Sequence, residues 1–123
     1  MNALRRIGLN RIAGWARVFG ANAFAERLLV TARREFPDDA RTLAALGFLY
    51  AQQDRRREAL ALFDRASALA PDHAEYAFNR GFLLQELNDH DAAIASFRVA
   101  IARNPEHDRA LYGLALSLIA TRR

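Results

Sequence analysis

The side chains best suited to chemistry in this sequence are three histidines, His73, His90 and His107, which recur at intervals of 17 residues. Histidine is a common metal ligand, so an even spacing suggests a metal site. The helices predicted below place His73 and His107 in turns between repeats, whereas His90 falls in a turn within a repeat. These turns lie at opposite ends of helices about 20 Å long, at about 1.5 Å per residue. We therefore predict solvated histidines and no bound metal.

No group of residues in the sequence resembles a catalytic centre. There is no glycine-rich phosphate loop, no nucleophile motif and no carboxylate–histidine cluster on one helical face. Cysteine is absent, which excludes disulfides and thiol chemistry. We predict a protein that is not an enzyme and that binds no cofactor.

The excess positive charge is confined to the first 25 residues, which hold four arginines and no acid. The chain of 123 residues has a net charge of +4, so residues 26–123 are neutral as a block. A neutral block does not supply the basic stripe that phosphate binding needs, and we predict no nucleic-acid partner. The N-terminal helix, with Trp15, is expected to cap the rest of the chain. The alternative is contact with an anionic membrane or a nucleic acid.

The sequence contains no segment expected to cross a membrane. No apolar run reaches about 18 residues, the length that indicates a membrane-spanning helix. Arginines interrupt the N-terminal segment, which does not resemble a secretory signal. We therefore expect a cytoplasmic protein without a membrane span.

Three prolines, Pro37, Pro71 and Pro105, lie 34 residues apart, and each closes the same frame. Read towards the proline, this frame is Ala-x3-[Phe/Leu]-x2-Ala-x4-Pro. A fixed period of 34 residues is typical of a helix–turn–helix solenoid. The other frame residues are Ala25, Leu29 and Ala32, then Ala59, Phe63 and Ala66, then Ala93, Phe97 and Ala100.

Apolar residues recur at helical spacing on both sides of a turn in each repeat, which predicts a helix A followed by a helix B. Gly20 is expected to make this turn in the first repeat, and Asp54 to begin it and cap the next helix in the second. The predicted fold is all-α, a right-handed α-solenoid of three repeats and a terminal helix in one domain over residues 1–123. The expected repeats are about 6–39, 40–73 and 74–107, with the terminal helix at about 108–121. The expected helices lie near 4–19, from Asn22 to 35, 40–52, 56–69, 74–87, 90–103 and 108–121.

These residues resemble the tetratricopeptide repeat (TPR) family, whose pattern is a bulky residue, Leu-Gly and Tyr in helix A, then Ala, Phe, Ala and Pro in helix B. In the third repeat Arg80 precedes the glycine and Leu84 replaces the tyrosine. The first repeat matches in helix B alone, with Leu29 at the aromatic position. Over about residues 6–121, the resemblance implies a solenoid that binds other proteins and rarely carries chemistry. The matching residues are Leu46, Gly47, Tyr50, Ala59, Phe63, Ala66 and Pro71, then Gly81, Ala93, Phe97, Ala100 and Pro105.

Two glycines of this pattern are interpreted as packing positions. Gly47 and Gly81 lack side chains, so helix B can approach helix A closely there. The small residues Ala59 and Ala93 are expected to face them. Phe63 and Phe97 are expected to fill the space between consecutive repeats.

The resemblance also implies a binding surface, because in this family the helix A faces line the concave side. Aromatic side chains with an arginine nearby are typical of binding hot spots. The expected partner is a protein or peptide with apolar anchor residues, either an extended peptide or an amphipathic helix. The alternative is that the rings only tighten a narrow superhelix. The implied partner-binding residues are Arg41, Phe48, Phe78, Asn79, Phe82, Gln85, Arg109, Tyr112 and Leu116.

Some family members grip a C-terminal carboxylate with a clamp of lysines, arginines and asparagines. Here Asn79 and Arg109 match that clamp, whereas Ala44, Phe48 and Gly113 occupy its other positions. A carboxylate ligand of this kind is therefore not expected.

Apolar residues surround the expected terminal helix almost completely. A terminal helix with no unit behind it needs a polar outer face. Leu111, Leu114 and Leu118 can pack on the preceding helix B, but other apolar side chains would stay exposed. The chain could be part of a longer array, two chains could pair through this end, or a ligand could cover it, and the first two are favoured. Self-association into homo-oligomers, through this helix or the groove, is the alternative function.

Three consecutive arginines, Arg55, Arg56 and Arg57, begin helix B of the second repeat. Cations at a helix N-terminus oppose the helix dipole, so helix formation does not explain this run. A solvated face is the first interpretation, and contact with an acidic partner is the second.

Overall fold

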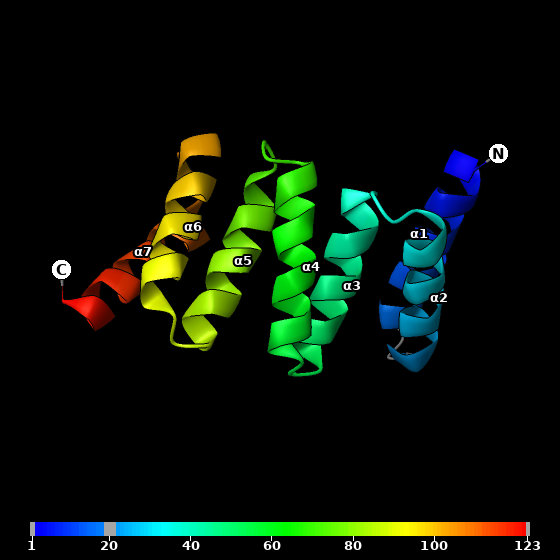
Figure 1. The fold of residues 1–123 in the computed structure, drawn as a ribbon, viewed down its shortest axis with the longest axis horizontal. Helices are drawn as coiled ribbons and strands as arrows, with labels where there is room; N and C mark the ends of the chain where they lie inside the picture. The colour runs from blue at the N-terminus through cyan, green and yellow to red at the C-terminus, as the bar shows by residue number, and fades with distance from the viewer. Residues whose placement is uncertain (1, 19–21, 123) are drawn as a thin grey trace.

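The computed structural model describes the backbone of residues 2–18 and 22–122, and every element within these ranges is an α-helix (Figure 1). The predicted all-α fold is confirmed, and the helix bounds differ from the expected ones by at most two residues. The turn expected at Gly20 and the side chain of Trp15 lie outside the described residues. The helices are α1 (Asn2–Val18), α2 (Asn22–Glu35), α3 (Ala40–Gln52), α4 (Arg56–Leu69), α5 (Ala74–Glu86), α6 (His90–Arg103) and α7 (Asp108–Thr121).

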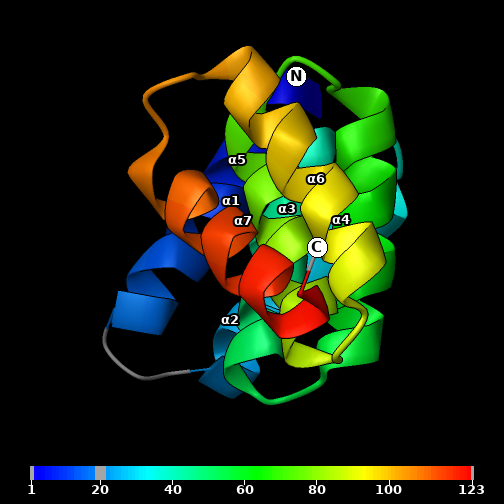
Figure 2. The ribbon, with the colours of Figure 1, turned by 90° about the vertical axis from the view of Figure 1, so that its left-hand side faces the viewer.

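The helices are stacked in chain order, so that each one packs against the next (Figure 1). We call α1, α3, α5 and α7 the A helices, and α2, α4 and α6 the B helices. Figure 2, which looks along the array, separates α1 and α7 on one side from α4 and α6 on the other. Helix α5 also contacts α7 directly. The A helices and the B helices therefore form two layers, as expected for an α-solenoid.

The phenylalanines of the B helices fill the space between the layers. Phe63 and Phe97 are 1% and 0% exposed. The Phe63 ring lies 3.0 Å from the point where a Cβ would stand on Gly47, and the Phe97 ring lies 2.8 Å from that point on Gly81. An added side chain at Gly81 would therefore collide with the buried Phe97 ring, and one at Gly47 would press tightly on the Phe63 ring.

The atoms nearest to Gly47 and Gly81 are ring atoms of Phe63 and Phe97, whereas the expectation that Ala59 and Ala93 face these glycines stays a prediction. A long side chain on a helix leans towards the helix N-terminus and covers the preceding turn. The phenylalanine four residues after each alanine therefore covers the surface next to that alanine. Both alanines are fully buried beneath it.

Gly113 of α7 makes a third contact of this kind, at a position that the family pattern does not mark. A Cβ on Gly113 would lie 2.6 Å from the tip of the Phe97 ring. The ring is therefore held between Gly81 on α5 and Gly113 on α7. One repeat earlier, the position of Gly113 is occupied by Asn79.

The turns within the second and third repeats use a left-handed backbone at equivalent positions, Asp54 with φ 60° and Asn88 with φ 63°. Short polar residues tolerate this conformation. Arg55 therefore holds the N-cap position of α4, without a side-chain capping bond, and the expectation that Asp54 caps this helix is wrong. In the third repeat Asp89 holds that position and accepts a hydrogen bond from the Ala92 N–H at 3.3 Å.

Helix α1 covers the N-terminal end of the array. Ala13 is 1% exposed and belongs to the hydrophobic core. The Asn10 side chain donates a hydrogen bond to the Thr42 hydroxyl of α3 at 3.1 Å, and Arg5 pairs with Glu35 of α2 at 2.7 Å. Among the described helices, none has the length and apolar character needed to cross a bilayer.

Arg80, which departs from the family pattern, stands where the second repeat has the fully buried Leu46. Its guanidinium forms an ion pair with Asp64 of α4 and donates a hydrogen bond to Ser96 of α6. A cation is accommodated at this position because the neighbouring B helices supply a carboxylate and a hydroxyl.

Replacing Gly81 by leucine is expected to destabilise the fold by about 1–3 kcal/mol, because the new side chain collides with the buried Phe97 ring. Urea unfolding measures this loss. The matched control is Gly8→Leu in α1, where no atom lies within 4 Å of an added Cβ. The control should be as stable as the wild type or more stable, since leucine forms helices better than glycine. Equal stability of the two variants would contradict the packing role of Gly81.

Candidate functional site

Two apolar hollows lie along the A helices. One, of about 360 Å³, lies between α3 and α5, and the other, of about 420 Å³, lies between α5 and α7. We call them the α3–α5 hollow and the α5–α7 hollow. Phe78, Phe82 and Arg109 line both. The two hollows are therefore continuous, and we call them together the A-helix groove.

The A-helix groove brings together eight of the nine residues that the family resemblance implied. Arg41 is the exception, since it is exposed on α3 but lines neither hollow. Asp108 was missed, because nothing in the sequence separates it from other acids in first helical turns, such as Glu75 and Asp91. The eight residues are Phe48, Phe78, Asn79, Phe82, Gln85, Arg109, Tyr112 and Leu116.

Four large apolar side chains of the groove are open to solvent. Phe48 is 45% exposed, Phe82 47%, Tyr112 68% and Leu116 41%. Phe78 differs from them, because it is only 8% exposed. The expectation that Phe78 lies on a surface left free by the protein's own packing is therefore wrong. Phe78 is part of the wall, whereas the other four present area that a partner could cover.

Phe78 is buried because side chains from α6, from α7 and from the turn between them pack around it. The guanidinium of Arg109 lies 4.7 Å from the centre of its ring, in a cation–π contact. The ring centres of Phe97 and His107 lie 6.0 Å and 4.9 Å from it. These contacts fix the Phe78 ring at the junction of the two hollows.

Arg109 is held in place by Glu75, one repeat earlier. One guanidinium nitrogen donates to both carboxylate oxygens of Glu75, at 2.9 Å and 3.0 Å. His107 lies 2.7 Å from the same carboxylate through Nε2, and its Nδ1 accepts a hydrogen bond from the Ala110 N–H at 3.2 Å. Because Nδ1 is an acceptor, the neutral ring carries its proton on Nε2 and donates it to Glu75. The positive charge of Arg109 is thus matched within the protein.

The amides along the groove fall into two groups. Gln85 donates hydrogen bonds to the Gly113 carbonyl at 3.0 Å and to the Ser117 hydroxyl at 2.9 Å. It therefore joins α5 to α7. Within the part of the chain that the structure describes, the side-chain amides of Gln52 and Asn79 have no hydrogen-bond partner. Both line the α3–α5 hollow, where they can bond a ligand.

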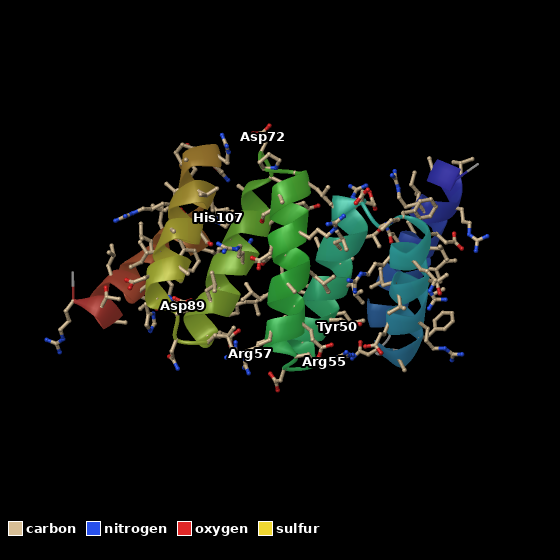
Figure 3. The ribbon with its side chains drawn as sticks, viewed as in Figure 1. Tyr50, Arg55, Arg57, Asp72, Asp89 and His107 are labelled. Atoms are coloured by element: carbon tan, nitrogen blue, oxygen red, sulfur yellow. The ribbon has the colours of Figure 1, made fainter. Side chains whose placement is uncertain are left out.

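The three histidines have different environments. His107 is 6% exposed and caps α7, so the expectation of a solvated side chain is wrong for this residue (Figure 3). His73 is exposed and stacks on Tyr76 at 3.9 Å, and His90 lies 3.4 Å from the Ser117 hydroxyl. Among the described residues, no three His, Cys, Asp or Glu side chains are placed to hold a metal ion.

Arg55 is not part of a solvated face, because it joins three helices near the turn of the second repeat (Figure 3). Its guanidinium lies 3.8 Å from the centre of the Tyr50 ring and pairs with Glu26 of α2 at 2.6 Å and with Glu58 of α4 at 2.7 Å. The hydrogen bond that Arg55 donates to Glu58 raises the pKa of Arg55 further above its ordinary value. The hydrogen bond from Arg55 lowers the pKa of Glu58.

Arg56 is also engaged within the protein, with Asp54 at 3.4 Å and with Glu86 of α5 at 3.3 Å. Arg57 is exposed, as predicted. The interpretation of the run as a solvated face is therefore wrong for its first two members. They hold the turn and the neighbouring repeats together.

Fold and site together define an α-solenoid of helix–turn–helix repeats whose A helices frame an apolar groove. A tetratricopeptide repeat model matches residues 46–119, which is more than half of the chain. The chain therefore belongs to the tetratricopeptide repeat family, as the resemblance implied.

Solved structures with this fold cover nearly the whole chain. An O-GlcNAc transferase mutant from Thermobaculum terrenum matches with a TM-score of 0.87 and 29% identity, over 96% of this chain and 23% of the transferase. MamA matches with a TM-score of 0.89 and 21% identity, over 94% of this chain and 68% of MamA. The first TPR of Spaghetti (RPAP3), bound to the HSP90 peptide SRMEEVD, matches with a TM-score of 0.92 and 14% identity, over 98% of this chain and 95% of the Spaghetti domain. The chain thus spans about a quarter of the transferase, and the two more distant structures establish the fold alone.

The pair of Arg55 and Glu58 gives a test of pH dependence. The folded protein lowers the pKa of Glu58 from its ordinary value of 4.5, so this pair stabilises the fold above that pH. The stabilisation is lost as the pH falls through the lowered pKa, where the carboxylate is protonated. We expect Glu58→Gln to have a lower Tm than the wild type at about pH 7, and this difference to shrink as the pH falls through the lowered pKa.

The matched control for Glu58→Gln is Glu106→Gln. Glu106 is exposed, and in the described part of the chain its carboxylate has no ion-pair partner. Its Tm difference from the wild type should stay near zero across the pH range. A Tm difference for Glu58→Gln that does not change with pH would rule out the ion pair as its source.

Proposed function

We propose that this chain is a protein-interaction scaffold that binds a peptide or a helix of a partner protein in the A-helix groove. One observation carries this proposal: Phe48, Phe82, Tyr112 and Leu116 are 41–68% exposed and lie along one continuous groove. Contiguous exposed apolar side chains mark interaction sites, and aromatic residues contribute most to binding. The buried ring of Phe78 fits the alternative that the rings only tighten the array. The exposure of the four side chains named above does not fit it.

Family membership supports the same proposal, since tetratricopeptide repeat domains are generally non-catalytic interaction modules. The Spaghetti domain is bound to a peptide. As part of the proposal, this chain has no catalytic role and no nucleic-acid partner, and it works in the cytoplasm. We also propose one domain over residues 1–123, with repeats at about 6–39, 40–73 and 74–107 and the terminal helix at about 108–121.

The charges of the groove argue against an acidic ligand such as the peptide bound by Spaghetti. Arg109 is the only cation among the lining residues, and Glu75 already matches its charge. Glu86 and Asp108 add carboxylates to the lining. A peptide with several acidic residues would meet like charges here.

Self-association is a second candidate function, because α7 exposes apolar side chains. Leu111 is 43% exposed and Ile119 is 70% exposed. Exposed apolar residues at the last helix of an array can pair with a second copy. This interface would use the end of the array, whereas the first proposal uses the groove.

The groove proposal is tested by selecting a random peptide library against the protein. We expect the wild type to enrich binding peptides, and Phe82→Arg to lose their binding by about tenfold or more, since Phe82 lines both hollows. Phe24→Arg is the matched control, because Phe24 is 49% exposed on α2, outside the groove. No enrichment, or equal loss in both variants, would overturn the proposal.

Self-association is tested by light scattering over a concentration series. A monomeric scaffold should show a mass near 13.8 kDa at every concentration. If a dimer forms through α7, Ile119→Arg should return the mass to that of the monomer, and Phe82→Arg should leave the dimer intact. The opposite pattern would place the interface in the groove.

A further inference from the structure

The two hollows of the A-helix groove are copies of one another, displaced by one repeat. For six of the ten residues that line the α3–α5 hollow, adding 34 to the residue number gives a residue that lines the α5–α7 hollow. The groove therefore offers the same kind of site twice, with aromatic walls in each copy. The corresponding pairs are Phe48 with Phe82, Phe63 with Phe97, and Phe78 with Tyr112.

The distance between the two sites follows from helix packing. Each hollow lies between two successive A helices, so its copy is displaced by one spacing between A helices. Helices α5 and α7 contact each other, and packed helices lie about 8–10 Å apart. A ligand that fills both hollows must therefore present two apolar side chains about 8–10 Å apart on the same side.

Few regular peptide conformations meet this requirement. In a polyproline II helix, residues i and i+3 point the same way and are about 9 Å apart. In a β-strand, residues on one side lie about 7 Å or 13 Å apart, which does not fit. In an α-helix, residues i and i+7 share a face at about 10 Å, which does fit.

The unpartnered amides of the α3–α5 hollow favour the polyproline II conformation over the α-helix. The backbone groups of an α-helix hydrogen-bond to one another, whereas a polyproline II segment has no hydrogen bonds between its own backbone groups. Gln52 and Asn79 line this hollow, and within the described residues their side-chain amides have no partner. Each can donate to and accept from the backbone of an extended ligand.

The charges of the α5–α7 hollow favour a basic residue in the ligand. Glu75 matches the charge of Arg109, and Arg56 pairs with Glu86. Asp108 lines this hollow, and among the described residues it has no ion-pair partner. Its carboxylate is therefore the charged group of the groove that no ion pair engages.

We propose that the A-helix groove binds an extended, polyproline II segment of a partner protein, with apolar side chains at positions i and i+3. The two side chains occupy the two hollows, and a basic residue next to one of them faces Asp108. This proposal rests on the proposed function of the groove and adds the spacing and charge of its ligand.

Fluorescence polarisation with labelled synthetic decapeptides tests the spacing. The probes are proline-based peptides with two leucines, placed at positions i and i+2, i and i+3, or i and i+4. A further peptide has a single leucine. We expect the peptide with leucines at i and i+3 to bind at least about tenfold more tightly than the others, because it alone fills both hollows. Equal affinities, or no binding by this peptide at about 1 mM, would overturn the proposal.

Protein variants that change one hollow at a time show where each leucine of the peptide binds. Phe48→Ala changes the α3–α5 hollow alone, and Leu116→Ala changes the α5–α7 hollow alone. In each variant, the peptides with one and two leucines should bind equally, whereas the control Phe24→Ala should keep the preference of the wild type. A second leucine that still improves binding in both variants would contradict the assignment.

Two further comparisons complete the test. A lysine beside one leucine should strengthen binding relative to glutamate, and Asp108→Asn should reduce this preference. Tighter binding of an amphipathic helical peptide with leucines at i and i+7 would overturn the extended conformation. Library peptides that lose binding in Phe82→Arg but lack the i, i+3 spacing would refute this inference and leave the proposed function standing.

Discussion

Phe63 of α4 and Phe97 of α6 pack into space left by glycines of the A helices, and this contact determines how these repeats are built. Phe97 lies against the positions of Gly81 and Gly113 on two successive A helices. Because protein interiors are close-packed, neither helix can move inwards without displacing the ring. The same ring is part of the wall of the α5–α7 hollow. The separation of the A helices and the depth of the groove therefore depend on one side chain.

Phenylalanine has two different roles in the A-helix groove. Phe78 and Phe82 lie one turn apart on α5, with ring centres 6.2 Å apart, yet their exposed fractions are 8% and 47%. The first is covered by His107 and by Arg109 of α7, and the second is about half exposed. A rigid buried ring thus supports an accessible one, which reduces the conformational entropy that a partner must overcome on binding.

The sequence predicted the helices well because their signals are local and repeated. Pro71 and the apolar spacing before it define the end of α4 without reference to the rest of the chain. The burial of Phe78 and His107 was not predicted, because the groups that cover them come from other helices, far away in the sequence. The prediction that Asp54 caps α4 was wrong for a different reason. Aspartate suits both an N-cap and a left-handed backbone, and only its position relative to Arg55 decides which of the two it adopts.

The pair of Glu75 and Arg109 limits how this array can grow by duplication. These residues are 34 positions apart, so they occupy the same place in two successive A helices, and Arg41 occupies it one helix earlier. The sign of the charge therefore alternates along this column. A tandem copy of the third repeat would place two glutamates next to each other, and like charges in contact destabilise a structure. Repeats of this chain are thus not interchangeable modules, since each carries a charge that suits particular neighbours.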